Sequence, residues 1–204
     1  MKKILIIGCG GHAKSCVEIL EKLKDYQIIG LVNRDKHLNK KKKILNYPII
    51  GFDKDLKNLS KKYKNVLIGL GQIKDYQTRL KLFTKIQKLN FKLPTIIAPN
   101  AEVSINSKIG LGTIVMQHVI INSGTIIGNN CIINNKALIE HDVKIHENCH
   151  ISTAAIINGN SVIKKNTFVG SGAIISNNVT VGANSIVGAG VVIKKNVKDH
   201  SKIK

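Results

Sequence analysis

The sequence predicts two consecutive units of different architecture: an α/β, Rossmann-like domain at residues 1–98 and an all-β parallel β-helix at residues 99–204. Three observations lead to this prediction. Strands alternate with helices in the first half, residues repeat with a period of six in the second, and Pro94 and Pro99 lie between the two halves. The alternation is typical of a parallel sheet with helical crossovers. The six-residue period is typical of a solenoid.

In the first unit, apolar runs alternate with segments of helical period. Apolar runs that end in or near glycine predict buried strands at residues 3–8, 26–32 and 65–71. The helical period predicts helices at Ala13–Leu23, Asp53–Lys62 and Asp75–Leu89. We expect a basic loop containing Pro48 between the second strand and the second helix.

In the second unit, every sixth residue from Val103 to Ile193 is isoleucine or valine. The residue four places after each of these is small or β-branched, as far as Val197. No amphipathic helix has this period. One large aliphatic and one small inward residue in every six favour a β-helix with three-sided coils, in which residues 18 apart stack on one face.

The composition limits the classes of function. The formal net charge is +20, and residues 1–100 carry 22 basic and 7 acidic residues. Because only 4% of residues are aromatic and the basic run Lys40–Lys43 has no stacking residues within it, we expect a solvated basic surface that attracts anionic small molecules, not nucleic acid. No apolar run is long enough to span a membrane. Four cysteines without CxxC spacing favour a reduced, cytoplasmic protein.

A glycine-rich turn, "GCGGHAK" at Gly8–Lys14, connects the first predicted strand to the first helix. Backbone amides at such a helix N-terminus can bind a phosphate group. A dinucleotide is compatible with the glycines, since Ala13 supplies the small residue that the fingerprint needs. However, Val32 and Asn33 stand where an NAD site has its ribose-binding acid, and Asp35 comes slightly late. This placement favours a nucleotide sugar over NAD.

Histidines of the second unit offer either a metal site or a catalytic base. His118, His141 and His146 occupy three different positions of the six-residue repeat, so they do not form a shared metal site, and we expect no metal. His141 lies between two acids in "IEHD", with Glu140 before it and Asp142 after it. A carboxylate beside an outward-facing imidazole orients the ring for general-base chemistry. We therefore expect His141, Asp142 and Glu140 to form a catalytic centre.

The opening "GxGGH" and the hexapeptide repeats containing "IEHD" resemble the hexapeptide-repeat sugar acyltransferases related to sialic acid O-acetyltransferase and to bacillosamine-type N-acetyltransferases. The resemblance covers nearly the whole chain. It implies a left-handed β-helix and a homotrimer with active sites between neighbouring prisms. It also implies acetyl-CoA as donor and a UDP-linked sugar held by the first unit. Family members usually continue with a "GxPAK" segment that helps to cover coenzyme A, whereas this sequence ends in "KDHSKIK", which implies either a shortened chain or weaker donor binding.

The resemblance also assigns roles to individual residues. It implies that His141 is the base and that Asp142 tunes it. Sugar nucleotide contacts would come from Gly10, Gly11, His12, Asp35 and Gly71, and contacts to the acetyl donor from His150, Ser171 and Ala189.

Three functions remain open on the sequence. The first, favoured by the glycine-rich turn, is acetylation of the amine of a nucleotide-linked 4-amino-6-deoxy sugar for bacterial surface glycan or glycoprotein synthesis. The second is O-acetylation of a sialic-acid-like sugar, because one base serves an amine or a hydroxyl. The third is a nicotinamide-dependent enzyme or a non-catalytic solenoid.

Overall fold

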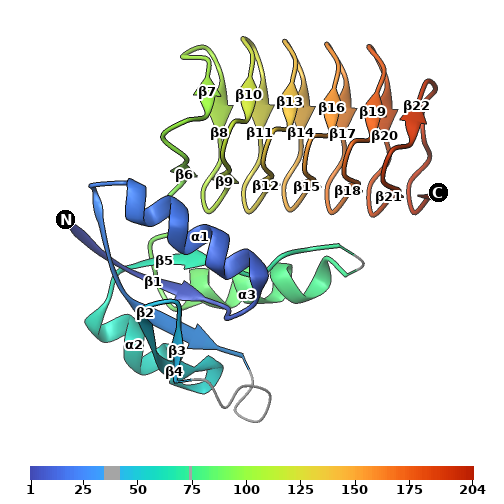
Figure 1. The fold of residues 1–204 in the computed structure, drawn as a ribbon. Coiled ribbons are helices and arrows are strands. Elements are labelled where there is room, and N and C mark those ends of the chain that lie inside the picture. Colours follow the sequence, from blue (N-terminus) through green and yellow to red (C-terminus); the bar gives the residue numbers. More distant parts are fainter. Residues whose placement is uncertain (35–41, 74) are drawn as a thin grey trace. The chain divides into compact units, whose positions relative to one another are not determined.

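The computed structural model describes residues 1–34, 42–73 and 75–204. The chain divides into two compact units (Figure 1). The first unit comprises Met1–Gly71 and Thr78–Pro94, and the second comprises Gln72–Gln77 and Thr95–Lys204. The short segment Gln72–Gln77 therefore belongs with the β-helix, although the sequence analysis placed it in the first unit. Within the described ranges, no helix combines the length and apolarity needed to cross a membrane.

The first unit is built on a five-stranded sheet with the order β3-β4-β2-β1-β5. Its strands are β1 (Lys2–Ile7), β2 (Tyr26–Asn33), β3 (Lys43–Ile44), β4 (Tyr47–Phe52) and β5 (Asn65–Ile68). Its helical elements are α1 (Gly11–Lys22), the 3-10 turn η1 (Asp53–Asp55), α2 (Leu56–Lys62) and α3 (Gln77–Lys88). β1 pairs in parallel with β2 and β5, and β2 pairs in parallel with β4. The alternating α/β architecture agrees with the sequence-based prediction.

The expectation of a loop around Pro48 was wrong, because β3 and β4 form a hairpin there and β4 extends the sheet. Proline lacks an amide hydrogen and is tolerated only where the ladder does not need one. Pro48 meets this condition, since the parallel pairing of β4 with β2 begins one residue later, at Ile49 opposite Leu31.

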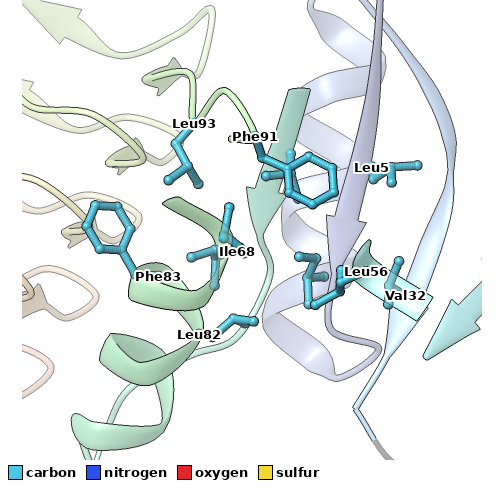
Figure 2. Close-up of a cluster of buried hydrophobic side chains, with 11 residues drawn as sticks. Leu5, Val32, Leu56, Ile68, Leu82, Phe83, Phe91 and Leu93 are labelled. Atoms are coloured by element: carbon cyan, nitrogen blue, oxygen red, sulfur yellow. The ribbon is translucent and has the colours of Figure 1, made fainter. Parts of the chain in front are cut away.

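Apolar side chains from the sheet and from the helices of the first unit form one core (Figure 2). The sheet supplies Leu5, Ile7, Val32, Val66 and Ile68. α2 contributes Leu56, and the helix α3 with the segment after it contributes Leu82, Phe83, Ile86, Phe91 and Leu93. Burial of these side chains fixes the carboxyl ends of the strands, where the glycine-rich turn begins.

The second unit is a left-handed parallel β-helix with three flat faces, as predicted. Each face is a stack of two-residue strands that pair in parallel with the strand 18 residues away, for example Ile120 with Leu138. The last pair differs, because Ile186 lies opposite Lys202. The β7 face comprises β7 (Glu102–Val103), β10 (Ile120–Ile121), β13 (Leu138–Ile139), β16 (Ile156–Ile157), β19 (Ile174–Ile175) and β22 (Val192–Ile193). The β8 face comprises β8 (Lys108–Ile109), β11 (Ile126–Ile127), β14 (Lys144–Ile145), β17 (Val162–Ile163) and β20 (Thr180–Val181).

The third face, named the β6 face, begins before the repeats and ends with the last strand. It comprises β6 (Ile96–Ile97), β9 (Ile114–Val115), β12 (Ile132–Ile133), β15 (His150–Ile151), β18 (Phe168–Val169), β21 (Ile186–Val187) and β23 (Lys202–Ile203).

The interior of the prism follows the six-residue period. The second residue of each strand points inward, so that Ile139, Ile157 and Ile175 are fully buried. The small positions are also buried, among them Cys131 and Cys149. Cys149 is therefore a core residue, and burial raises the pKa of its thiol.

The turns between faces explain the many asparagines. From residue 112 to residue 190, the second residue of each turn has a left-handed backbone, which asparagine and glycine adopt at the lowest cost. Asn130, Asn148, Asn166 and Asn184 occupy this position in four successive coils. Their side-chain amides bond from coil to coil at 2.7–2.9 Å. This ladder ties the coils together along one edge of the prism.

Candidate active site

His141 is the first residue of the turn that joins β13 on the β7 face to β14 on the β8 face. The backbone around it is tied to both neighbouring coils. The Asn160 amide donates to the carbonyl of His141 at 3.0 Å, and the Asp142 amide donates to the carbonyl of Ser123 at 3.0 Å. The turn is thus held rigidly, and the side chain of His141 projects from a fixed position.

The side chains of His141 and Asp142 form a direct pair. Nδ1 of His141 lies 2.9 Å from Oδ2 of Asp142, and the two side chains are 60% and 64% exposed. Because an ionised carboxylate can only accept, Nδ1 donates the hydrogen. In the neutral ring this leaves the lone pair on Nε2, which a general base requires.

Glu140 takes a different part in the site than its neighbour Asp142. Its Oε2 accepts a hydrogen bond of 3.0 Å from the side-chain amide of Asn122, which lies one coil earlier. Its carbonyl accepts a bond of 2.8 Å from the hydroxyl of Thr125. The recorded contacts of Glu140 therefore anchor the turn, whereas Asp142 is the acid that contacts the imidazole. The sequence analysis did not find Asn122, although it lies 18 residues before Glu140.

Two glycines leave room for the His141–Asp142 pair. A Cβ on Gly124, one coil before Asp142, would lie 2.3 Å from Oδ1 of Asp142. A Cβ on Gly159, one coil after His141, would lie 2.7 Å from Nε2 of His141. Both distances are far shorter than van der Waals contact, so the pair occupies the space of two missing side chains.

His150 lies on the β6 face and is only 5% exposed. Its Nδ1 donates to the backbone carbonyl of Gln72, and its Nε2 faces the Asn134 amide at 3.4 Å. The ring packs edge-on against Phe168, with a centroid distance of 5.2 Å. Gln72 is fixed in turn by a bond of 2.8 Å from its side-chain amide to the carbonyl of Asn148. Gln72 thus covers His150.

Ser171 and Ala189 are the first residues of turns that join the β6 face to the β7 face. Both are exposed, and they lie one coil apart, linked by a bond of 2.9 Å from the Gly190 amide to the Ser171 carbonyl. The Ser171 hydroxyl also lies 2.9 Å from that of Ser152. His141 belongs to a different edge of the prism, between the β7 and β8 faces. Within one chain, the predicted donor residues and the predicted base are therefore separated by the width of the β7 face.

In the first unit, four of the predicted sugar nucleotide residues lie at or beside the N-terminus of α1: Gly10, Gly11, His12 and Gly71. Gly10 precedes the helix, and no side chain of the described residues caps its N-terminus. A Cβ on Gly10 or Gly11 would meet open space. A Cβ on Gly71 would lie 3.8 Å from the Cβ of His12, so these two residues are neighbours. Asp35 lies outside the described residues.

The same edge of the sheet carries further polar groups. Asn33, at the end of β2, is 7% exposed, and its Nδ2 has no hydrogen-bond partner among the described residues. Arg34 approaches Asp53 at 3.8 Å. Burial raises the pKa of the Asp53 carboxyl, against the attraction of Lys85 and Arg34. An amide at the Asn33 position can bond a ligand group without adding charge.

Comparison with known proteins matches both units. Residues 3–86 match the model of the PglD N-terminal domain, and residues 160–195 match the bacterial transferase hexapeptide model of six repeats. The chain is 31% identical to a histidine-to-asparagine mutant of perosamine N-acetyltransferase from Caulobacter crescentus, solved in complex with CoA and GDP-perosamine. That match covers 98% of this chain and 91% of that chain, with a TM-score of 0.89. The chain belongs to the hexapeptide-repeat sugar acyltransferases.

Two further structures share the fold of this sugar acyltransferase. The acetyltransferase domain of PglB from Neisseria gonorrhoeae FA1090, in complex with acetyl coenzyme A, is 29% identical with a TM-score of 0.90, and the match covers 98% of this chain and 95% of that chain. WeeI from Acinetobacter baumannii AYE is 22% identical with a TM-score of 0.85, over 99% and 96% of the two chains. The comparison with curated proteins gave no match.

One residue of this sugar acyltransferase escaped the sequence analysis because it looked like an ordinary helix residue. Arg79 in α3 is fully buried, and its Nη1 donates to the carbonyls of Ile68 at 2.9 Å and Leu70 at 2.6 Å. A buried guanidinium is retained where it bonds several groups. Arg79 therefore holds the end of β5, from which Gly71 follows.

Across the described ranges, no group of three or more potential metal ligands is present.

Proposed function

We propose that this protein transfers the acetyl group of acetyl-CoA to the amine of a nucleotide-linked 4-amino-6-deoxy sugar. The observation that carries the proposal is the exposed His141, whose Nδ1 is engaged by Asp142 and whose Nε2 is available. Support for the donor comes from the PglB domain, which was solved with acetyl coenzyme A. Support for the acceptor comes from the perosamine enzyme, which was solved with CoA and GDP-perosamine.

In the proposed reaction, the sugar amine attacks the thioester carbonyl carbon while Nε2 of His141 takes the proton from nitrogen. The new bond is C–N, and the C–S bond breaks when the tetrahedral intermediate collapses. The coenzyme A thiolate leaves and receives a proton from the imidazolium, so the enzyme returns to its starting state. Asp142 keeps the ring oriented and stabilises its positive charge. No covalent enzyme intermediate is needed.

We further propose a homotrimer with each active site shared by two prisms. Two observations support this. First, His141 lies on one edge of the prism, whereas Ser171 and Ala189 lie on another, so a site that uses both needs a second copy. Second, the outward residues of the β7 face between these edges are aliphatic in five successive strands: Ile120, Leu138, Ile156, Ile174 and Val192. A solvent-facing column of this kind marks an association surface.

In this arrangement, Ser171, Ala189 and the region of His150 bind the donor, and the glycine-rich turn with His12 and Gly71 binds the acceptor. The nucleotide is uridine diphosphate on the sequence-based expectation. The GDP-perosamine complex of the relative gives guanosine diphosphate as the second candidate.

The test is to incubate the protein with acetyl-CoA and a panel of acceptors, and to follow both free thiol and product mass. The panel contains UDP- and GDP-linked 4-amino-6-deoxy sugars, the corresponding 4-hydroxy sugars and sialic acids. The proposal expects acceptor-dependent thiol release and a product heavier by one acetyl group with an amino sugar nucleotide alone. Transfer only to a hydroxyl acceptor, or no transfer to any acceptor, would refute it.

A further inference from the structure

We propose that Gly159 is a positioning residue for His141, because it leaves empty the space in which the imidazole lies. The importance of this position for catalysis rests on the proposed function, whereas the steric relationship does not. Gly159 lies one coil after His141, at the same position of its own turn.

The imidazole of His141 lies where a side chain at position 159 would begin. A Cβ on Gly159 would be 2.7 Å from Nε2 and 2.8 Å from Cε1 of His141. Carbon atoms make contact at about 3.5–4.0 Å, so a methyl group at this place would force the ring to move. The side-chain amide of Asn177, 3.3 Å from the same point, bounds the space on the following coil.

The backbone of this turn does not require glycine at position 159. Gly159 is not among the residues with a left-handed backbone, and it is Asn160, the next residue, that adopts a φ of 58°. In Gly124, by contrast, a φ of +75° gives an independent reason for glycine. Glycine at position 159 is therefore required by the space that the imidazole occupies and not by the backbone conformation.

The equivalent positions of the other turns support this conclusion. Between residues 105 and 189, all of which the structure describes, the first turn residue carries a Cβ in every hexad except that of Gly159. These residues are Ile105, Leu111, Gln117, Ser123, Asn129, Asn135, His141, Glu147, Thr153, Lys165, Ser171, Asn177, Ala183 and Ala189. The turn accepts side chains of every size, and glycine is found only beneath the imidazole.

The consequence for catalysis concerns both ring nitrogens. With the ring over Gly159, Nδ1 reaches Oδ2 of Asp142 at 2.9 Å. Nε2, the nitrogen that would accept the proton, lies 2.7 Å from the point that a Cβ on Gly159 would occupy. A side chain here would turn the ring away from Asp142 and crowd Nε2. Gly159 thus fixes the orientation of the base and keeps its reactive nitrogen accessible.

The test is a double-mutant cycle between Gly159→Ala and His141→Ala. Gly159→Ala should lower kcat about 10²-fold, the effect of misplacing a catalytic group by about 1 Å, with little change in the KM for acetyl-CoA. Its melting temperature should not fall, because alanine is compatible with this backbone. In the His141→Ala background, the same substitution should change the residual rate less than about twofold.

Three outcomes would overturn the proposal: unchanged kcat in Gly159→Ala, an equal loss of rate with and without His141, or a failure of both Gly159→Ala and the double variant to fold. If Gly159→Ala misfolds but the double variant folds, the conflict with His141 is established directly. Ring ¹⁵N NMR of His141 at alkaline pH separates this proposal from the proposed function. Even if the wild type transfers acetyl to no acceptor, it should show the Nδ1-protonated tautomer, and Gly159→Ala should lose it; an unchanged tautomer would refute the steric role.

Discussion

Nδ1 of His141 and Oδ2 of Asp142 lie 2.9 Å apart on a turn whose backbone is bonded to the coils before and after it. This relationship links the repeat to the chemistry. The β-helix supplies a rigid wall, the turn projects an imidazole from it, and the next residue orients the ring. An exposed side-chain pair of this kind contributes little to stability, so the pair can be altered without loss of the fold.

His141→Ala should lower kcat by roughly 10²- to 10⁴-fold, since it removes the proposed general base. The measurement is steady-state thiol release at saturating acetyl-CoA and acceptor. His146→Ala is the matched control, because His146 is exposed and lies just beyond β14. The control should keep nearly full activity. A His141→Ala protein that retains more than about a tenth of the wild-type kcat would rule out this base.

Asp142 should affect both activity and stability, and two substitutions separate the effects. Its φ is 60°, and Asn160 and Asn178 adopt the same conformation in the following coils. Asp142→Asn should therefore preserve the turn and lower kcat about 10- to 100-fold through lost orientation. Asp142→Ala should show at least this loss and also reduce the free energy of unfolding by roughly 1 kcal/mol, because alanine is strained there.

Asn178→Ala is the control for the Asp142 variants, since it changes the same left-handed position two coils later and loses a bond of 2.7 Å to Asn160. It should reduce stability without lowering kcat. Thermal unfolding and initial rates of the three variants test the assignment. Full activity in Asp142→Asn would show that the carboxylate of Asp142 does not orient the imidazole.

Much of the second unit could be predicted from the sequence because its period is strict. The same period could also have revealed Asn122, Gly124 and Gly159, which lie 18 residues from Glu140, Asp142 and His141. The covering of His150 could not have been found in this way. It depends on Gln72, which belongs to no repeat, and a contact 78 residues apart has no periodic signal. The hairpin at Pro48 was missed because proline usually marks a loop, and only the pairing register shows why it is tolerated.

The aliphatic column of the β7 face should be required for assembly. Ile156→Asp places a charge in the middle of this column and should convert the proposed trimer into monomers, with loss of activity. Val162→Asp on the β8 face is the control, because its column includes Lys108, Lys144 and Thr180 and is already polar. Light scattering and sedimentation measure the mass. A wild-type protein that is monomeric at micromolar concentration, or a trimeric Ile156→Asp variant, would contradict the assignment of this surface.

Cys9 gives a probe of the acceptor loop, since it lies between Gly8 and Gly10. Burial raises the pKa of its thiol to about 11, so little thiolate exists at neutral pH. Alkylation by iodoacetamide should be slow at pH 7 and rise about tenfold per pH unit toward the pKa. A bound nucleotide sugar should protect Cys9 from this reaction. Peptide mass spectrometry measures both effects. Rapid labelling at neutral pH would contradict the raised pKa of Cys9, and a lack of protection would contradict its place in the acceptor loop.

The proposed sharing of each active site between two prisms makes a prediction that no single variant can test. His141→Ala removes the base from one edge of the prism, and Ala189→Trp should block the proposed donor site on another edge. Each variant alone should be nearly inactive. The two variants are co-expressed with different tags, and trimers that contain both are purified. In these mixed trimers, some sites combine an intact His141 edge from an Ala189→Trp chain with an intact donor edge from a His141→Ala chain. Every mixed trimer, whichever variant it holds twice, has one such site among its three, so about a third of the wild-type activity should return. A site contained within one chain would give no recovery, and mixed trimers as inactive as their parents would therefore refute the sharing of the site between prisms.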